Sequence, residues 1–442
     1  MNIKSRIKRL IDDTQYVTAL EEQNALLKAN LQKEKAQKCA DEETQYQKRS
    51  RNYLRPIKDM QEWLLQNYDF RYNVITDVFE YRKKSSSKMF GSKKEKDEKD
   101  SDEYEVIDKY AINSIAIEIQ EAGIFVKDHF VERLIKSKYA KHYHPVRSYI
   151  NKVKGTWDGK ERVSDFLSRI NQTDYCQKMG RIWLRAMVAQ MAGIDENHAN
   201  SVMLTLVSAK QGLHKSTFLR NLLPMELRDY YTDDFSLNQK GNAQRKIVEF
   251  AIINDDELDK ENPKKMPLMK TLMQTMKPSF IGSYKKNFNR LPRSASFTGT
   301  SNKLELLTDR TGSRRFLILE PEGMIQVKDI EHDQIYAQLL AEIEEGEPYY
   351  FSKEDEQEMQ LHNQPYYVKT ALEKMICNYY RKATHEEEKL LLSASNLLEI
   401  LRQKGIKELK QVTENTFSKA LTRLFGAPQH TKLGNVYAVA KI

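Results

Sequence analysis

Short apolar runs alternate with amphipathic stretches along the middle third of this chain. The runs are rich in β-branched and small residues, and they occupy 201–207, 247–254, 294–302 and 316–319. Runs of this length, bounded by polar segments, are typical of strands rather than helices. A helical pattern at 161–196 precedes them. Because strands that alternate with helices form layered sheets, we predict an α/β core with helices on its faces.

The pattern before this core predicts two further segments. Residues 1–50 carry a short heptad repeat, which favours either a parallel coiled coil or a helix that is solvated or docked on a partner. Residues 51–140 predict a small α+β domain, with a helix, a hairpin at 72–81 and helices over 104–140. The stretch 84–103 is Ser, Lys, Glu and Asp without apolar periodicity, and it predicts a disordered loop.

The pattern after the core predicts a separate small domain. Residues 351–366 are interpreted as a linker between 141–350 and 367–442. The last segment predicts helices at 368–382, 393–403 and 414–425, followed by a hairpin over 429–442 that turns at Gly434-Asn435. Three helices with a terminal hairpin indicate a winged-helix-like domain, a fold that binds DNA or other proteins.

Candidate chemistry begins directly after the first core strand. The segment 208–217 (SAKQGLHKST) joins that strand to a helix and ends in Lys-Ser-Thr, as a phosphate-binding loop does. Lys215 would neutralise the β- and γ-phosphates of a nucleotide, and the Ser216 hydroxyl would ligate magnesium. The alternative is an ordinary strand–helix turn. The predicted nucleotide-binding residues are Gln211, Gly212, Leu213, His214, Lys215, Ser216 and Thr217.

This loop departs from the standard phosphate-binding pattern at two positions. Ala209 and His214 stand where the pattern has glycine, and Gly212 is the glycine that remains. A left-handed backbone costs a non-glycine residue roughly 1–2 kcal/mol. We therefore expect right-handed or extended dihedrals at both positions.

Polar residues follow the next core strands. Asp256 and Glu257 end the second run, and we assign Asp256 to a magnesium ion and Glu257 to the attacking water. The alternative is an exposed acidic strand end. Asn302 ends the third run, where its amide would orient that water.

Two arginines, Arg314 and Arg315, precede the last core strand. Arginine suits contact with phosphate and with transition-state charge, and this position suggests a finger that acts on a neighbouring subunit. A structural salt bridge is the alternative.

A basic, aromatic segment lies between the second and third strands. Lys285, Lys286, Arg290 and Arg293 are interleaved with Tyr284 and Phe288. Such residues contact a phosphate backbone and stack on unpaired bases, although a solvated basic loop has the same composition.

In combination these motifs resemble the virulence-associated E family. The resemblance rests on QGLHKST, IINDDELDK, RLPRSASFTGTSNK and DRTGSRRF, and it covers about 140–350. These are P-loop proteins of phages and mobile elements, related to superfamily 3 helicases and AAA+-like ATPases. The resemblance implies ATP and Mg²⁺ as cofactors, a homo-oligomer expected to be a hexameric ring, and DNA in its channel. It also implies that the basic segment is a DNA-contacting hairpin.

Bulk composition agrees with a polyanionic partner. The net charge is +9 and the pI about 9.0, which favours nucleic acid. The three cysteines are far apart, so we expect a reducing, cytoplasmic setting and no zinc knuckle. No apolar run approaches the length of a membrane span or a signal peptide.

Two functions remain open at this point. The first is a DNA-stimulated ATP hydrolase that translocates on DNA as a helicase. The second is a non-motor initiator, loader or scaffold that binds nucleotide and DNA without unwinding.

Overall fold

The computed structural model describes residues 47–84, 103–195, 197–234, 240–258, 266–281, 288–289, 291–309, 313–383, 390–431 and 434–442. The predicted heptad repeat, except its last residues, and almost all of the predicted disordered loop lie outside these ranges. The chain divides into two compact units, which are described separately. Unit 1 comprises Met1–Lys303 and Arg314–Leu361, and unit 2 comprises Leu304–Ser313 and His362–Ile442.

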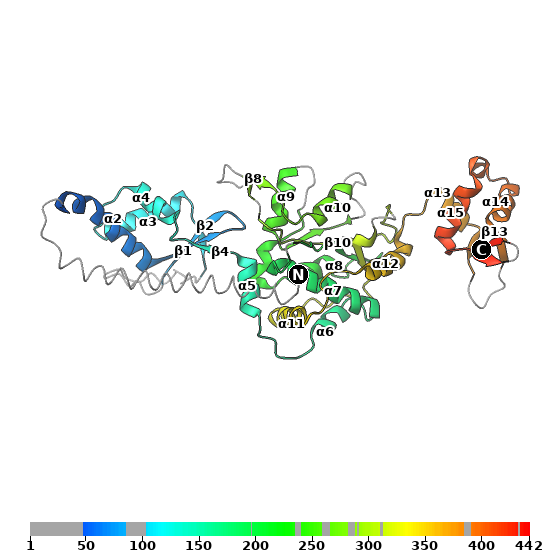
Figure 1. Cartoon of the computed structure of the whole chain (residues 1–442), viewed down its shortest axis with the longest axis horizontal. Helices are drawn as coiled ribbons and strands as arrows, with labels where there is room; N and C mark the ends of the chain where they lie inside the picture. Colours follow the sequence, from blue (N-terminus) through cyan, green and yellow to red (C-terminus); the bar gives the residue numbers. More distant parts are fainter. Residues whose placement is uncertain are drawn as a thin grey trace. The chain divides into compact units, whose positions relative to one another are not determined.

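Unit 1 begins with a small sheet and three helices, coloured blue to cyan in Figure 1. The strands β1 (Tyr68–Asn73), β2 (Val78–Lys83), β3 (Glu105–Val106) and β4 (Lys141–Tyr143) lie in the order β3-β2-β1-β4. The helices are α2 (Gln47–Asn67), α3 (Lys109–Glu121) and α4 (Asp128–Ile135). Met60, Phe70, Ile119 and Val131 are among the residues of their shared core. The predicted hairpin is present and longer than expected, because β1 pairs with β2 from Tyr68 to Lys83.

Three helices lead from this part into the central sheet. They are α5 (Pro145–Val153), α6 (Val163–Ser168) and α7 (Asp174–Ala192). The Thr173 side chain caps the start of α7 by accepting a hydrogen bond from the Cys176 amide, and Gly193 ends it with a left-handed φ of 68°. Most of α7 is buried, so this helix is a central element of the core rather than a surface helix.

The central sheet of unit 1 is entirely parallel. Its strands are β5 (Met203–Val207), β6 (Tyr231–Thr232), β7 (Ile252–Asp255), β10 (Ser296–Ser301) and β11 (Phe316–Leu319), in the order β11-β5-β10-β7-β6. The four predicted strands are present, but the one expected at 247–254 begins only at Ile252, because 247–249 are the last residues of α9. The two-residue β6 was not predicted. Strands buried on both faces read as continuous apolar runs, which is the pattern of β5 and β11. The protein therefore has the expected mixed α/β architecture.

Helices surround this sheet and complete unit 1 (Figure 1). They are η1 (Met225–Tyr230), α8 (Lys215–Arg220), α9 (Lys240–Glu249), α10 (Met266–Gln274), α11 (His332–Glu345) and α12 (Lys353–His362). Helix α12 occupies the segment interpreted as a linker, and that interpretation is wrong for it. The reason is burial, because Met359 of this helix belongs to the same core as the sheet.

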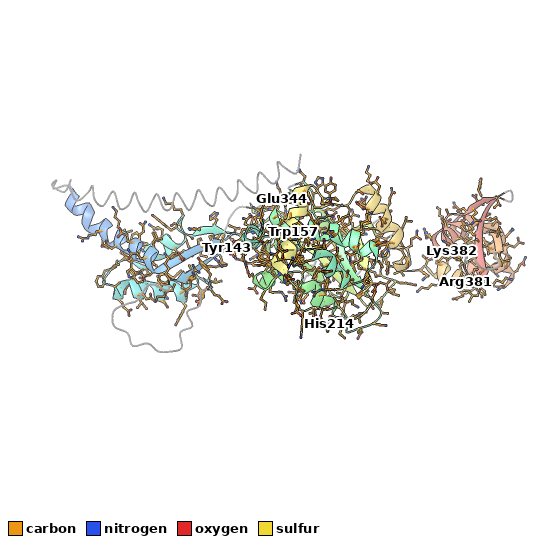
Figure 2. The ribbon with its side chains drawn as sticks, turned by 90° about the horizontal axis from the view of Figure 1, so that it is seen from below. Tyr143, Trp157, His214, Glu344, Arg381 and Lys382 are labelled. Carbon is orange, nitrogen blue, oxygen red and sulfur yellow. The ribbon has the colours of Figure 1, made fainter. Side chains whose placement is uncertain are left out.

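Unit 2 has its own core and a small antiparallel sheet. Its elements are η5 (Gln364–Tyr366), α13 (Ala371–Cys377), β12 (Tyr380–Lys382), β13 (Leu390–Ser393), α14 (Ala394–Gln403), η6 (Lys407–Gln411), α15 (Glu414–Phe425), β14 (Gln429–Thr431) and β15 (Gly434–Lys441). Strand β15 pairs with β12, β13 and β14. Arg381 and Lys382, labelled in Figure 2, lie on β12.

Two predictions for unit 2 need correction. The helix expected at 368–382 stops at Cys377, because Asn378 caps it and the chain then enters β12. Its start is sharp, since Thr370 and Glu373 form a capping box. The terminal hairpin is present, but Gly434 opens β15 opposite Thr431 instead of forming the turn.

Candidate nucleotide-binding site

Three neighbouring strands of the central sheet end at one edge. Strand β10 lies between β5 and β7, and all three are parallel. The loop that contains Lys215 follows β5, Asn302 follows β10, and Asp256 follows β7. Ligands of open α/β sheets bind at the carboxyl ends of the strands. The strand order therefore brings the predicted residues together.

Lys215 is fixed at the centre of this edge. Its side chain is buried, with 8% of the residue exposed. The Nζ atom donates to Asn302 Oδ1 at 2.8 Å and to the Ser208 carbonyl oxygen at 3.1 Å. The ammonium group thus lies between the phosphate-binding loop and the residue predicted to orient water.

The predicted magnesium ligands also meet. Ser216 Oγ donates to Asp256 Oδ1 at 2.8 Å. Mg²⁺ is commonly held by one or two carboxylates together with substrate phosphates and water. Within the described ranges, no group of three or more His, Cys, Asp or Glu side chains is arranged to hold a metal. The donors present therefore fit an ion that a nucleotide phosphate helps to bind.

Thr300 belongs to this site and was not predicted. Its hydroxyl donates to Asp256 Oδ1 at 2.6 Å and accepts from the Glu257 amide at 3.2 Å. One side chain thus positions both acidic residues. The signal in the sequence was the polar, β-branched pair Thr298 and Thr300, and the structure buries both of them in β10.

The backbone of the site is left-handed at two non-glycine residues. His214 has a φ of 62° and Glu257 a φ of 59°. The expectation of a right-handed or extended His214 is wrong, whereas Ala209 is not left-handed. Backbone hydrogen bonds surround the strained residue, since Leu213 accepts from Ile325 and His214 accepts from Phe218. Such outliers are concentrated at functional sites. The dihedral explains why the standard pattern has glycine here. His214 is labelled in Figure 2.

Arg314 and Arg315 lie at the opposite edge of the sheet. They directly precede β11, whose first residue Phe316 pairs with Met203 at the start of β5. The four steps from Met203 to Val207 span roughly 13 Å at the rise of a parallel strand. Within one chain, these arginines are therefore on the side away from Lys215.

The two arginines differ in their surroundings. Arg314 Nη1 forms an ion pair with Glu356 Oε2 at 2.8 Å, and 43% of its side chain is exposed. Arg315 Nε is buried without a hydrogen-bond partner. An ion pair within the chain, the alternative for these residues, is thus present at Arg314.

The basic segment is only partly described. Lys285, Lys286 and Arg290 lie outside the described residues. Strands β8 (Phe280–Ile281) and β9 (Phe288–Asn289) pair antiparallel on either side of the first two.

The prediction that Arg293 contacts DNA is wrong. This residue is 1% exposed, and its guanidinium donates to the backbone carbonyls of Ala295, Leu272, Met273 and Asn200. Its role is structural, because it satisfies carbonyls at the end of α10 and before β5.

The solved structures named below are only distantly similar to this chain. No curated protein matches the chain. Among solved structures, the apo structure of the NrS-1 C terminal region is 13% identical, with 88% of this chain and 99% of that chain covered and a TM-score of 0.39. The A form apo structure of the same region is 12% identical, with 87% and 99% covered and a TM-score of 0.39. Similarity at this level carries no argument about function.

Two further findings bear on the kind of protein. In the part of the chain that the structure describes, no helix has the length and apolarity that a membrane span requires. Residues 369–439 match a family described as a domain of unknown function from B. theta (DUF3874). Residues 150–368, just under half of the chain and including every described residue of the candidate site, match the virulence-associated protein E-like domain.

Proposed function

We propose that this protein is an oligomeric, magnesium-dependent ATPase that acts on DNA in the replication of a phage or mobile element, in the manner of superfamily 3 helicases. One observation carries the proposal. Two hydrogen bonds, Lys215–Asn302 and Ser216–Asp256, join residues far apart in sequence at the carboxyl ends of β5, β10 and β7, three consecutive strands of the parallel sheet. An ordinary strand–helix turn does not require this convergence.

The roles of the residues follow from their chemistry. Lys215 would exchange its contact with Asn302 for the β- and γ-phosphates of ATP, where its charge offsets the phosphate charge. Bound Mg²⁺ would neutralise charge that develops on the phosphates, with Ser216 and Asp256 as its protein ligands. Glu257 would accept a proton from the attacking water, and Asn302 would hold that water in line. Thr300 would hold Asp256 and Glu257 in register.

Three observations support DNA as the partner. The chain carries a net charge of +9. The pairing of β8 with β9 places a hairpin in the basic, aromatic segment. Unit 2 combines helices with an antiparallel sheet in which β15 lies between β13 and β14, as expected of a winged-helix-like domain.

A non-motor protein is the second candidate. The altered loop favours it, because Ala209 and His214 stand where the standard phosphate-binding pattern has glycine. Asp256, Glu257 and Asn302 favour the motor instead, because they complete the set that hydrolysis needs. DNA-stimulated hydrolysis separates the two. A motor should hydrolyse ATP faster when single-stranded DNA is added, whereas an initiator or scaffold should respond weakly.

Substitutions at the candidate site test the proposal. Lys215→Ala should abolish hydrolysis and weaken ATP binding, whereas Glu257→Gln should bind ATP and hydrolyse it far more slowly. Lys210→Ala is the matched control, because it removes an exposed lysine from the same loop. Hydrolysis at the parental rate in both site variants would show that the site is misassigned.

A further inference from the structure

A cavity opens at the edge of the central sheet away from Lys215. It has a volume of about 200 Å³ and lies where α7 ends and β5 begins. Ala186, Ala189, Val202 and Phe351 give it apolar walls. Lys215, Ser216, Asp256, Glu257 and Asn302 do not line it, whereas Glu356, which pairs with Arg314, does.

One buried polar atom in the cavity wall lacks a partner. Asn200 is 6% exposed, and its Nδ2 donates to Ser296 Oγ at 3.1 Å, but its Oδ1 accepts no hydrogen bond. The neighbouring Gln190 is engaged on both sides, by the Asn200 amide and the Arg293 carbonyl. A buried acceptor without a donor lowers the stability of the folded protein. A ligand that donates a hydrogen bond to this oxygen would remove that penalty and gain binding free energy.

Two aromatic rings line the same cavity as Asn200. The His198 and Tyr350 rings are stacked, with centroids 5.8 Å apart and planes at 18°. Tyr350 is 53% exposed. His198 is held by its Nδ1 contact with Asp195 Oδ2 at 2.7 Å, and Asp195 also accepts from the Asn197 amide. The result is a fixed, exposed platform on which a flat ring can stack.

We propose that this cavity binds an amino-bearing nucleobase, cytosine or adenine. The base stacks on the Tyr350–His198 platform, and its exocyclic amino group donates to Asn200 Oδ1. Asp195 and Glu356 also line the cavity, where they pair with His198 and Arg314. This site adds to the proposed function and does not depend on hydrolysis at Lys215.

The test compares two pyrimidine strands on the full chain. Cytosine carries an amino donor where thymine carries a carbonyl acceptor, so oligo-dC should bind more tightly than oligo-dT of equal length, measured by fluorescence anisotropy. Tyr350→Ala should weaken oligo-dC binding about 5- to 150-fold and reduce the preference. Tyr350→Phe keeps the ring and should retain both. Phe125→Ala removes another exposed aromatic, outside the cavity, and should change neither.

Several results would overturn the proposal. The first is equal affinity of the parent protein for oligo-dC and oligo-dT, and the second is an unchanged preference for oligo-dC in Tyr350→Ala. The third is a change only in the oligomeric state of Tyr350→Ala, which would mean that another copy of the chain covers the cavity. Competition with cytidine monophosphate shows whether the base comes from a free nucleotide or from a DNA strand. Displacement of oligo-dC indicates a free nucleotide, and its absence indicates a strand. ATP hydrolysis by the Lys215→Ala variant is scored separately, so failure of one site is distinguishable from failure of the other.

Discussion

At the scale of single residues, His214 shows how a loop keeps its shape without its usual glycine. Glycine adopts the φ of 62° observed there without steric cost. We expect His214→Gly to retain hydrolysis within about tenfold, because roughly 1–2 kcal/mol of strain is removed while the unfolded chain gains freedom. Steady-state ATPase rates measure this. His214→Val, β-branched at a left-handed position, should lose both activity and stability. A loss of several hundredfold in His214→Gly would instead assign the imidazole a role on phosphate.

Thr300 provides a second residue-scale prediction. Thr300→Val keeps the shape of the side chain but removes the hydroxyl that contacts Asp256 and the Glu257 amide. Hydrolysis should fall about 10- to 100-fold, as it does when supporting residues of metal ligands are lost, and ATP binding should change little. Thr300→Ser should restore the rate. Thr298→Val is the matched control, since its hydroxyl contacts Asn254. Equal loss in both valine variants would indicate a general packing effect.

The sequence predicted the residues that meet at the candidate site better than the residues that support them. Lys215, Ser216, Asp256 and Asn302 were predictable because each follows an apolar run and carries a chemistry that the site needs. Arg293 was misassigned because nothing local distinguishes a guanidinium that binds phosphate from one that satisfies backbone carbonyls. That distinction depends on where the end of α10 packs, which is set by tertiary structure.

At the scale of elements, helix α5 carries a pH-sensitive cap. His144 precedes it and accepts a hydrogen bond from the Arg147 amide. Burial lowers the pKa of His144 to about 3, and the nearby Arg147 charge acts in the same direction. When the pH falls below 6.5, the ordinary pKa of histidine, His144 becomes protonated in the unfolded chain but stays neutral in the folded chain. Stability contributed by neutral His144 is therefore complete above pH 6.5 and is lost as the pH falls towards 3.

This linkage predicts a measurable slope. Between pH 6.5 and 3 the free energy of unfolding should fall by up to about 1.4 kcal/mol per pH unit because of His144 alone. His144→Asn keeps a capping side chain without titration, so its stability should decline about 2 kcal/mol less between pH 7 and 5. Tryptophan fluorescence during urea unfolding measures it, because Trp63, Trp157 and Trp183 all lie in unit 1. His129→Asn, at an exposed histidine, is the control, and parallel slopes in parent and His144→Asn would refute the assignment.

Elements were predictable where the apolar pattern was long. The four core strands and α7 follow from it, as do α14 and α15. The short strands β6, β12 and β13 exist through pairing with neighbours rather than through their own residues. Helix α12 looked like a linker because its exposed face is acidic, and its buried residues are Asp355 and the core residue Met359.

At the scale of the whole molecule, the position of Arg314 predicts a shared active site. Because Arg314 and Lys215 are at opposite edges of the sheet, the arginine would reach a neighbour's ATP rather than its own. Arg314→Ala or Arg315→Ala should leave ATP binding nearly intact and reduce hydrolysis by about 10³-fold or more. Mixing an arginine variant with Lys215→Ala should partly restore the rate, because some interfaces then combine an intact loop with an intact arginine. If mixed oligomers form but stay inactive, these arginines act within their own subunit, where Arg314 pairs with Glu356.

The separation of these two edges has a consequence for assembly. A donor surface and an acceptor surface on different sides of one subunit join head to tail, an arrangement that either closes on itself or continues indefinitely. An open row always leaves one unused loop at one end and one unused arginine at the other. Only a closed ring uses every site, so the ATPase rate per subunit should depend on whether the ring is complete. Dilution that dissociates the ring should therefore stop hydrolysis while each subunit remains folded.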